Sequence, residues 1–386
     1  MDKKVIIYIG GFELPDKNAA ANRVMNNAKI MRDIGYHVVL VGVSADCDVC
    51  IENTKAVYDG FECWSLRYDS PGDRFKKQMD ISLYSAVLER YGDISALILY
   101  NYPAIGLYRF KRYCNKNNIS LVVDCTEWYG MPYGNLLVKV IKWADIYTRM
   151  MILHKKTDGI ICISRYLQNY YQKHTKTVYV PALIDSKDQQ WQKNKTEDGS
   201  CTRLVYSGSP GRQKDKINKI IEGLYALKEY DFLFQVVGIS KKEYLKYYEE
   251  HTDIIEELAG KVTFLGRVTH ETALEYVKNA DFTIFFRDKT RVSMAGFPTK
   301  FVESISAKTP VITNMTSNLT DYLIDGVNGF FVEKHQDITH TLEMVFSLDK
   351  EAIAKMHKNC NAELFDYRNY IAGVEVFLGD ILNGKE

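Results

Sequence analysis

With 386 residues, the chain is longer than a single hydrophobic core usually serves, so its length predicts two domains. Its 50 Lys and Arg residues against 49 Asp and Glu residues give a net charge of +1, which excludes the electrostatic signature of a nucleic-acid-binding protein. No run reaches the roughly 18 apolar residues of a membrane span, and the N-terminal run MDKKVIIYIGG is too short for a signal peptide.

The first half of the chain alternates short apolar runs with helical patterns. Such alternation predicts a parallel sheet with helices on both faces. The predicted strands are residues 5–9, 38–43, 97–100, 121–125, 159–163 and 178–180, and the predicted helices are residues 20–34, 105–115 and 135–156.

A polar stretch at residues 185–202 predicts a linker, and the alternation then restarts. The second set has predicted strands at residues 204–206, 232–237, 262–264, 282–286, 311–313 and 329–332, and helices at 216–227 and 244–258. We therefore expect an α/β protein with two doubly wound, Rossmann-like domains, residues 1–184 and 185–365, which face each other across a ligand cleft. Residues 366–386 are expected to form a helix that crosses back to the first domain.

Two strand-to-helix turns could hold a phosphate. The first contains Gly10 and Gly11; it lacks the G-x-G-x-x-G dinucleotide pattern, but paired glycines let the backbone approach a ligand, unless the turn only connects strand and helix. The second, YSGSPGRQKD at residues 206–215, places Ser209, Arg212 and Lys214 on a glycine-rich loop. Arg and Lys on such a loop suit a diphosphate, whereas the alternative is a solvated surface.

Residues 294–314, MAGFPTKFVESISAKTPVITN, place a glycine turn before a predicted helix. The free N–H groups and the dipole at a helix N-terminus favour an anion. Lys300 in the first turn adds a positive charge, and Glu303 is placed to accept two ribose hydroxyls. This segment therefore predicts a nucleotide-sugar site.

These motifs stand in order with FLGRV at 264–268, AD at 280–281, TPVI at 309–312 and DGVNG at 325–329. Together they resemble the family 4 glycosyltransferases, retaining nucleotide-sugar enzymes of the GT-B fold, and most closely the bacterial members that build surface polysaccharides. The likeness runs from Gly10 to Gly329 and is more specific in the second half. It implies that Arg212 and Lys214 stabilise the leaving diphosphate. It also implies donor contacts from Arg267 and Val268 near the base, from Gly296, Phe297 and Pro298 near the sugar, from Thr299 and Lys300 near the phosphates, and from Glu303 at the ribose.

One position departs from that family's pattern. The family often carries two glutamates eight positions apart, and the first would fall at Ala295, which cannot bind a sugar hydroxyl. The contact would have to move, for example to backbone or to Asp288. In the first half, Asp124 and Glu127 follow the apolar strand residues 121–123 and could reach the cleft. Glu127 is expected either to orient sugar or acceptor, as a catalytic-site residue, or to cap a helix.

No metal and no other cofactor is expected. In a retaining transfer, a phosphate oxygen of the leaving group can take the proton of the acceptor, and cations can stabilise the diphosphate. Asp46 and Asp48 lie in a loop rather than at a strand end, so we discount them as a metal pair. Cys47 and Cys50 form a lone C-x-x-C without further ligands, which favours ordinary reduced loop cysteines.

Residues 139–156, which include His154, mix large apolar side chains with five cations and one acid. They predict either an amphipathic surface that meets a lipid-linked acceptor at an anionic membrane, or a core-packed helix with a basic outer face. We therefore expect the protein in the cytoplasm or at the inner face of the membrane.

The main hypothesis is transfer of a sugar from a nucleotide diphosphate, UDP rather than GDP, to a saccharide or lipid-linked acceptor in cell-surface polysaccharide synthesis. A sugar-nucleotide epimerase of the same architecture would need carboxylates and His in acid–base roles. A non-catalytic partner subunit of a glycosyltransferase is the third hypothesis, and Ala295 is the feature that favours it.

Overall fold

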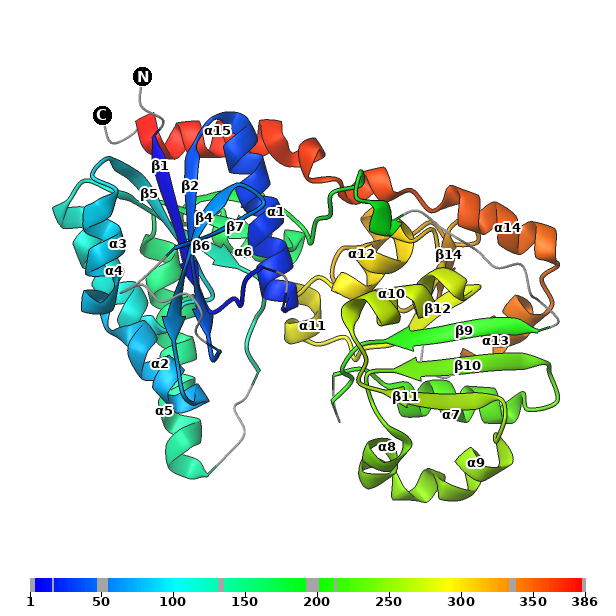
Figure 1. Cartoon of the computed structure of the whole chain (residues 1–386). Helices are drawn as coiled ribbons and strands as arrows, with labels where there is room; N and C mark the ends of the chain where they lie inside the picture. The colour runs from blue at the N-terminus through cyan, green and yellow to red at the C-terminus, as the bar shows by residue number, and fades with distance from the viewer. Residues whose placement is uncertain are drawn as a thin grey trace. The chain divides into compact units, whose positions relative to one another are not determined.

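The computed structural model describes residues 4–15, 17–46, 55–130, 135–191, 201–211, 214–332 and 338–383. The chain divides into two compact units, coloured from blue to red along the chain in Figure 1. Unit 1 consists of Met1–Ile184, Ala295–Phe297 and Asp366–Glu386, and unit 2 consists of Asp185–Met294 and Pro298–Phe365. The C-x-x-C pair lies outside the described residues.

Unit 1 contains an eight-stranded sheet in the order β3-β4-β2-β1-β5-β6-β7-β8, parallel except for the β3–β4 pair. Its strands are β1 Val5–Gly10, β2 His37–Ser44, β3 Ala56–Tyr58, β4 Phe61–Arg67, β5 Ile94–Tyr100, β6 Ser120–Cys125, β7 Gly159–Cys162 and β8 Lys176–Tyr179. Its helices are α1 Ala19–Ile34, α2 Pro71–Met79, α3 Ser85–Arg90, α4 Ala104–Lys116, α5 Leu136–Tyr147, α6 Arg165–Tyr171 and α15 Ile371–Leu382.

The core of unit 1 follows from apolar strands that helices cover on both faces. Every residue of β1 and β6 is buried, as expected for inner strands of a parallel sheet. Helix α1 begins at the N-cap Asn18, whose side chain accepts from Ala21 N, and ends at Gly35 with φ 116°. Helix α15 packs against α1 and β8, and its Phe377 and Leu378 join the same apolar cluster as Tyr8.

Unit 2 contains a six-stranded parallel sheet in the order β11-β10-β9-β12-β13-β14. Its strands are β9 Thr202–Ser207, β10 Phe232–Val237, β11 Val262–Gly266, β12 Phe282–Phe285, β13 Val311–Thr313 and β14 Gly329–Phe331. Its helices are α7 Ile217–Ala226, α8 Lys241–Tyr247, α9 Thr252–Glu257, α10 His270–Asn279, α11 Arg291–Ala295, α12 Thr299–Ser306, α13 Ile338–Phe346 and α14 Lys350–Asn359. Helix α7 packs with α13, and α10 packs with α12 (Figure 1).

The predicted fold class is confirmed, with differences in detail. The predicted elements do not include β3, β4, α2 or α3. The predicted helix at 244–258 is two helices, α8 and α9, separated at residues 248–251. The predicted helix at 135–156 is α5 followed by a π-helical segment, Thr148–Leu153, and a 3-10 turn, His154–Lys156. Its last part is buried at Leu153 and His154. None of the helices in the described residues is both long and apolar enough to span a bilayer.

Candidate functional site

Three neighbouring strands of unit 2 end in glycine at the same edge of the sheet. Gly208 follows β9, Gly238 follows β10 and Gly266 ends β11, with φ of 137°, 108° and 67°. These backbone conformations strongly favour glycine. A Cβ atom at Gly238 would lie 2.1 Å from the carbonyl oxygen of Gly208. Ligands of doubly wound sheets bind at this carboxyl edge. Here the three glycines have no side chains that would keep a ligand away from the backbone.

A buried cluster of charges lies at the same edge. The carboxylate of Asp215 accepts hydrogen bonds from Lys300 Nζ at 2.6 Å, from Arg287 Nε at 2.7 Å and from the hydroxyl of Tyr206 at 2.7 Å. The Lys300 ammonium also lies 4.0 Å from the centre of the Tyr206 ring. A Cβ atom at Gly208 would lie 3.2 Å from Lys300 Nζ, so the ammonium is held against the end of β9.

The cluster carries more positive than negative charge. Two cations, Lys300 and Arg287, share the single carboxylate of Asp215. Burial lowers the pKa of Lys300 to about 8, although Asp215 raises it; Arg287 lowers it further. Burial opposes the charge of Asp215, but Lys300 and Arg287 hold the pKa of its carboxyl well below the usual range. A buried excess of positive charge beside bare backbone favours an anionic ligand.

The loop residues predicted for the diphosphate lie at the surface of unit 2. Lys214 and Ser209 are exposed, and Arg212 lies outside the described residues. Lys216, at the start of α7, pairs with Asp288 at 2.7 Å. Asp288, considered above as a replacement for the missing glutamate, is therefore paired with a lysine.

The helix predicted after the glycine turn of residues 294–314 is α12, Thr299–Ser306, and Lys300 lies in its first turn as expected. Within the described part of the chain, no side chain caps the start of α12 at Pro298, which leaves N–H groups of its first turn for a ligand. Glu303 lies one turn on, partly exposed, and its Oε1 is 3.2 Å from Nε2 of His270. His270 is half exposed, and this contact places it beside the predicted ribose-binding residue.

The remaining donor-binding candidates differ in exposure. Phe297 and Pro298 are buried, Gly296 and Thr299 are partly exposed, and Arg267 and Val268 are exposed beyond the end of β11. Ala295 is fully buried at the end of α11.

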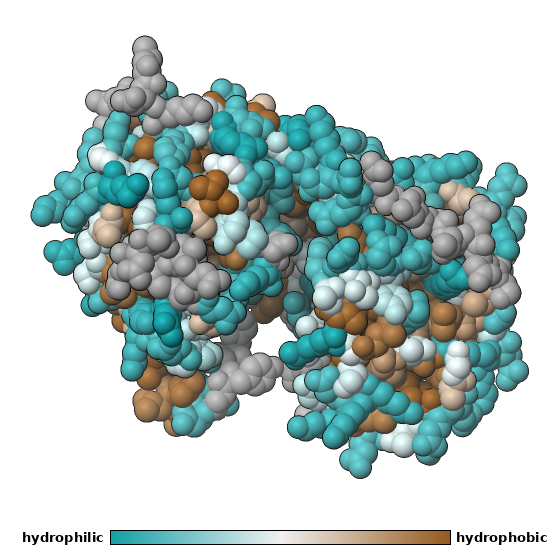
Figure 2. Space-filling view, in the orientation of Figure 1, coloured by the Kyte–Doolittle hydropathy of each residue, from teal (hydrophilic) through white to brown (hydrophobic). Residues whose placement is uncertain are grey.

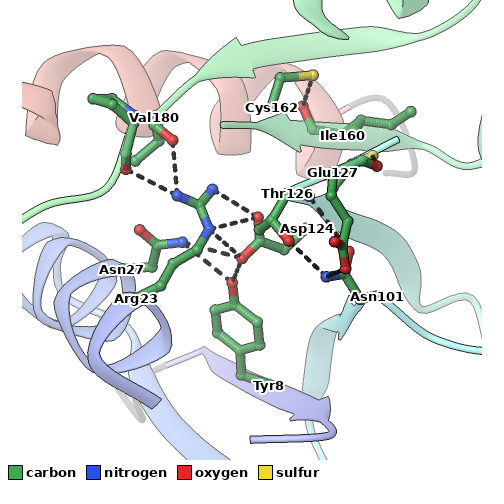
Figure 3. Close-up of polar contacts among 12 residues, drawn as sticks. Tyr8, Arg23, Asn27, Asn101, Asp124, Thr126, Glu127, Ile160, Cys162 and Val180 are labelled. Carbon is green, nitrogen blue, oxygen red and sulfur yellow. Dashed lines mark hydrogen bonds and ion pairs between the residues drawn. The ribbon is translucent and has the colours of Figure 1, made fainter. Parts of the chain in front are cut away.

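Unit 1 contains a second buried carboxylate cluster, drawn in Figure 3. Asp124 lies within β6 and is fully buried, so the expectation that it reaches a ligand is wrong. Arg23 donates to both carboxylate oxygens of Asp124, and Tyr8 donates its hydroxyl to Oδ2 (Figure 3). Nη1 of Arg23 donates to the carbonyl oxygens of Val180 at 2.9 Å and of Pro181 at 2.8 Å. The arginine and the carboxylate balance each other, and this cluster links α1, β6 and the chain after β8.

Glu127 differs from Asp124 because it is exposed just beyond the end of β6. Nδ2 of Asn101 lies 2.6 Å from Oγ1 of Thr126 and 3.5 Å from Oε1 of Glu127 (Figure 3). Asn101 itself has φ 45°, and Arg149 donates to its carbonyl oxygen at 3.2 Å. Among the described residues Glu127 caps no helix, since α5 has Asn135 as its N-cap. Its carboxylate is exposed, and it also hydrogen-bonds with the hydroxyl of Tyr129.

Gly10 and Gly11 both lie in close contact with neighbouring side chains. A Cβ atom at Gly10 would lie 2.5 Å from Cβ of Tyr100, and one at Gly11 would lie 2.1 Å from Nη2 of Arg74. Nη2 of Arg74 donates to the carbonyl oxygen of Gly11 at 2.7 Å. The contact with Tyr100 supplies a structural reason for Gly10, whereas at Gly11 the end of the flexible Arg74 side chain can shift. A donor role for both glycines stays a prediction.

Several residues of the site were missed from the sequence. Asp215 stood in the recognised loop motif without a role, while Tyr206, Arg287 and Gly238 received none either. A cation directly after the buried strand β12, as in FTIFFR, was the signal that could have identified Arg287. In the described ranges no group of three or more His, Cys, Asp and Glu side chains is arranged to hold a metal ion.

Comparison with known proteins bears on the class of this chain. Residues 187–363 match the family model for "Glycosyl transferases group 1". An uncharacterized glycosyltransferase of Methanocaldococcus jannaschii is 23% identical over 179 residues, which are 46% of each chain, so the chain spans about half the length of the curated relative it matches.

The similar solved structures extend over nearly the whole chain. Sucrose-phosphate synthase from Thermosynechococcus elongatus superposes with a TM-score of 0.73 at 15% identity, covering 99% of this chain and 100% of the other. HepE of Anabaena, solved in complex with UDP, has a TM-score of 0.64 at 13% identity, covering 97% and 99%. The chain has the GT-B fold, and its residues 187–363 are similar to the group 1 glycosyl transferases.

Proposed function

We propose that the chain is a retaining hexosyltransferase or related glycosyltransferase that moves a sugar from a nucleotide diphosphate to a saccharide or lipid-linked acceptor in cell-surface polysaccharide synthesis. The observation that carries the proposal is the cluster of Lys300, Arg287 and Asp215 beside Gly208. Two buried cations share one carboxylate there, at the ligand edge of a parallel sheet. A diphosphate would supply the missing negative charge.

The donor is proposed to bind along α12. Lys300 and N–H groups at the start of α12 hold the diphosphate, and Glu303 accepts from the ribose hydroxyls once His270 releases or shares it. Arg212 and Lys214 on the neighbouring loop are proposed to add charge to the leaving group. UDP is favoured over GDP because HepE, similar in fold, was solved with UDP.

In the proposed step, the bond between the anomeric carbon of the sugar and the leaving diphosphate oxygen breaks as the acceptor oxygen bonds to the same face of that carbon. The proton of the acceptor passes to a phosphate oxygen of the leaving group. Lys300 and Arg287 stabilise the charge that develops on the diphosphate, so no metal is required by this proposal. Glu127 is proposed to orient the acceptor or the sugar.

Thermal shift with a panel of nucleotides tests the donor class. UDP at 100 times its dissociation constant should stabilise the folded protein by about 2.7 kcal/mol, and GDP by less. The stabilisation should persist in EDTA. If no nucleotide raises the melting temperature, donor binding is refuted, and the non-catalytic subunit becomes the favoured reading because Ala295 replaces an expected acid. A product whose anomeric configuration is inverted by NMR would refute the retaining mechanism alone.

A further inference from the structure

Helix α5 exposes the apolar face that an amphipathic helix normally buries. Not one of its twelve residues is buried. Leu136, Val140, Trp143 and Tyr147 follow the i, i+4, i+7, i+11 spacing of one helix face, and their exposed fractions are 78%, 54%, 51% and 46%. A continuous apolar stripe of this kind marks a binding surface rather than scattered surface residues.

The stripe extends to neighbouring side chains of unit 1. Leu137 and Ile141 of α5 are 69% and 54% exposed, and Ile105 and Tyr108 of the adjacent helix α4 are 52% and 50% exposed. In Figure 2, brown apolar atoms gather at the lower left of the view, at the end of the unit where α5 begins. We call these residues of α4 and α5 the α5 surface.

The positive charge of α4 and α5 favours an anionic lipid surface over other binding partners for the α5 surface. Helices α4 and α5 contain six Lys or Arg residues and one acid, Asp145, in a chain whose net charge is +1. Asp145 is occupied, because its Oδ1 accepts from the N–H of Ala104 at 2.7 Å and its Oδ2 lies 3.8 Å from Arg149. The cations Lys139 and Lys142 are exposed among the apolar side chains.

The aromatic side chains of α5 also favour a lipid surface. The rings of Trp143 and Tyr147 are stacked with centres 5.2 Å apart, and both are half exposed. Trp and Tyr concentrate at the boundary between lipid and water, where one end of the ring is apolar and the other can hydrogen-bond. An apolar stripe flanked by Lys and carrying Trp and Tyr is the pattern of a helix that lies in the headgroup region.

We propose that the α5 surface docks unit 1 onto an anionic lipid bilayer. The apolar stripe enters the headgroup region, and Lys139 and Lys142 contact lipid phosphates. This inference goes beyond sugar transfer and does not depend on it, because the α5 surface contains none of the donor-binding residues.

The tryptophans provide a selective reporter for this docking. Trp64, Trp128 and Trp191 are 6%, 8% and 7% exposed, whereas Trp143 is 51% exposed. Adding vesicles of equal parts phosphatidylcholine and phosphatidylglycerol to the full chain should shift tryptophan emission to the blue and sediment the protein. Vesicles of phosphatidylcholine alone should do so at least tenfold more weakly, and added salt should weaken binding. In Trp143→Phe the protein should still sediment, but the emission shift should vanish.

Matched variants distinguish binding through the α5 surface from nonspecific binding to vesicles. Val140→Gln with Ile141→Gln should lower vesicle binding by about tenfold, since two side chains leave the apolar stripe. Val376→Gln on α15, at a site 66% exposed, should leave binding unchanged. UDP binding should be normal in all of these variants, so loss of docking and failure of the donor proposal are told apart.

Two outcomes would overturn the proposal. One is absence of binding to anionic vesicles at low salt. The other is a dimer by light scattering that the Val140→Gln, Ile141→Gln pair dissociates while neither protein binds vesicles, which would assign the α5 surface to a second copy of the chain.

Discussion

Each unit has a buried aspartate that accepts hydrogen bonds from a tyrosine hydroxyl and from arginine or lysine. The two clusters differ in how the charge of the aspartate is balanced. In unit 1, Arg23 satisfies Asp124 and then donates its remaining bonds to the carbonyl oxygens of Val180 and Pro181. Although burial disfavours its charge, Asp124 raises the pKa of Arg23. One positive and one negative charge cancel, and every partner comes from the chain itself.

In unit 2, one carboxylate faces two cations, and the chain supplies no second acid at the cluster among the described residues. The pKa of Lys300 is lowered to about 8 by burial, which shows that its charge is only partly compensated. The difference teaches that a buried ion pair by itself does not mark a binding site. The unbalanced charge next to glycine backbone is what supports the proposed donor site.

The largest expected effect tests the balanced cluster. Asp124→Asn should cost about 3–5 kcal/mol of stability, because it leaves the buried guanidinium of Arg23 without its counter-charge. Urea unfolding followed by circular dichroism measures this loss. The control is Asp380→Asn, whose pair with Lys176 joins side chains 51% and 60% exposed and should be worth less than about 1 kcal/mol. A stable Asp124→Asn protein would contradict the structural role of the cluster.

The second prediction concerns the unbalanced cluster. Lys300→Met should weaken UDP binding on the order of 100-fold by calorimetry, while folding is kept because Arg287 still pairs with Asp215. Lys214→Met should cost less, since an exposed charge acts through solvent. Lys228→Met, on an exposed pair with Glu257, is the neutral control. If Lys214→Met proved the more damaging, the loop rather than the buried cluster would hold the diphosphate.

The third prediction tests the ribose contact with a ligand change. The unmodified protein should prefer UDP to 2′-deoxy-UDP about tenfold, and Glu303→Ala should bind both equally weakly. His270→Ala keeps the carboxylate and should keep the preference, because its pair with Glu303 is partly exposed and contributes little. Equal discrimination in Glu303→Ala and in the unmodified protein would remove Glu303 from the ribose.

The smallest effect is a pH dependence. A diphosphate binds the protonated form of Lys300, so UDP affinity should be highest well below pH 8 and fall several-fold as the pH rises through about 8, where that form is lost. Asp215→Asn removes a charge that raises the pKa of Lys300, so the fall should begin at lower pH. Lys300→Arg stays protonated and should show no fall in this range. A fall that survives in Lys300→Arg would belong to another group.

The sequence predicted the elements whose signal is local. Strand β10 and helix α1 were placed within one residue, because buried parallel strands read as apolar runs and glycine ends helices. Strand β4 was missed because polar Glu62 and Ser65 interrupt its apolar pattern. The break between α8 and α9 was missed because the apolar spacing continues through it.

The site was predictable in part for a similar reason. Lys300 and Glu303 lie on one short helix, so their joint placement could be read from spacing. The pairing of Lys300 with Asp215 joins residues 85 positions apart and depends on which strands become neighbours. The burial of Asp124 could not be predicted either. A carboxylate at the end of an apolar run is compatible with a buried group and with a ligand-facing group.

The borders of the unit 1 sheet limit how this protein can self-associate. At one border, β3 has only three residues and turns back onto β4 in antiparallel register. At the other, β8 carries an exposed lysine, Lys176, and α15 packs against it. Short, charged or covered edge strands resist pairing with another sheet. Filaments built by strand addition are therefore disfavoured in this unit, and association that persists in concentrated solution should proceed through helices.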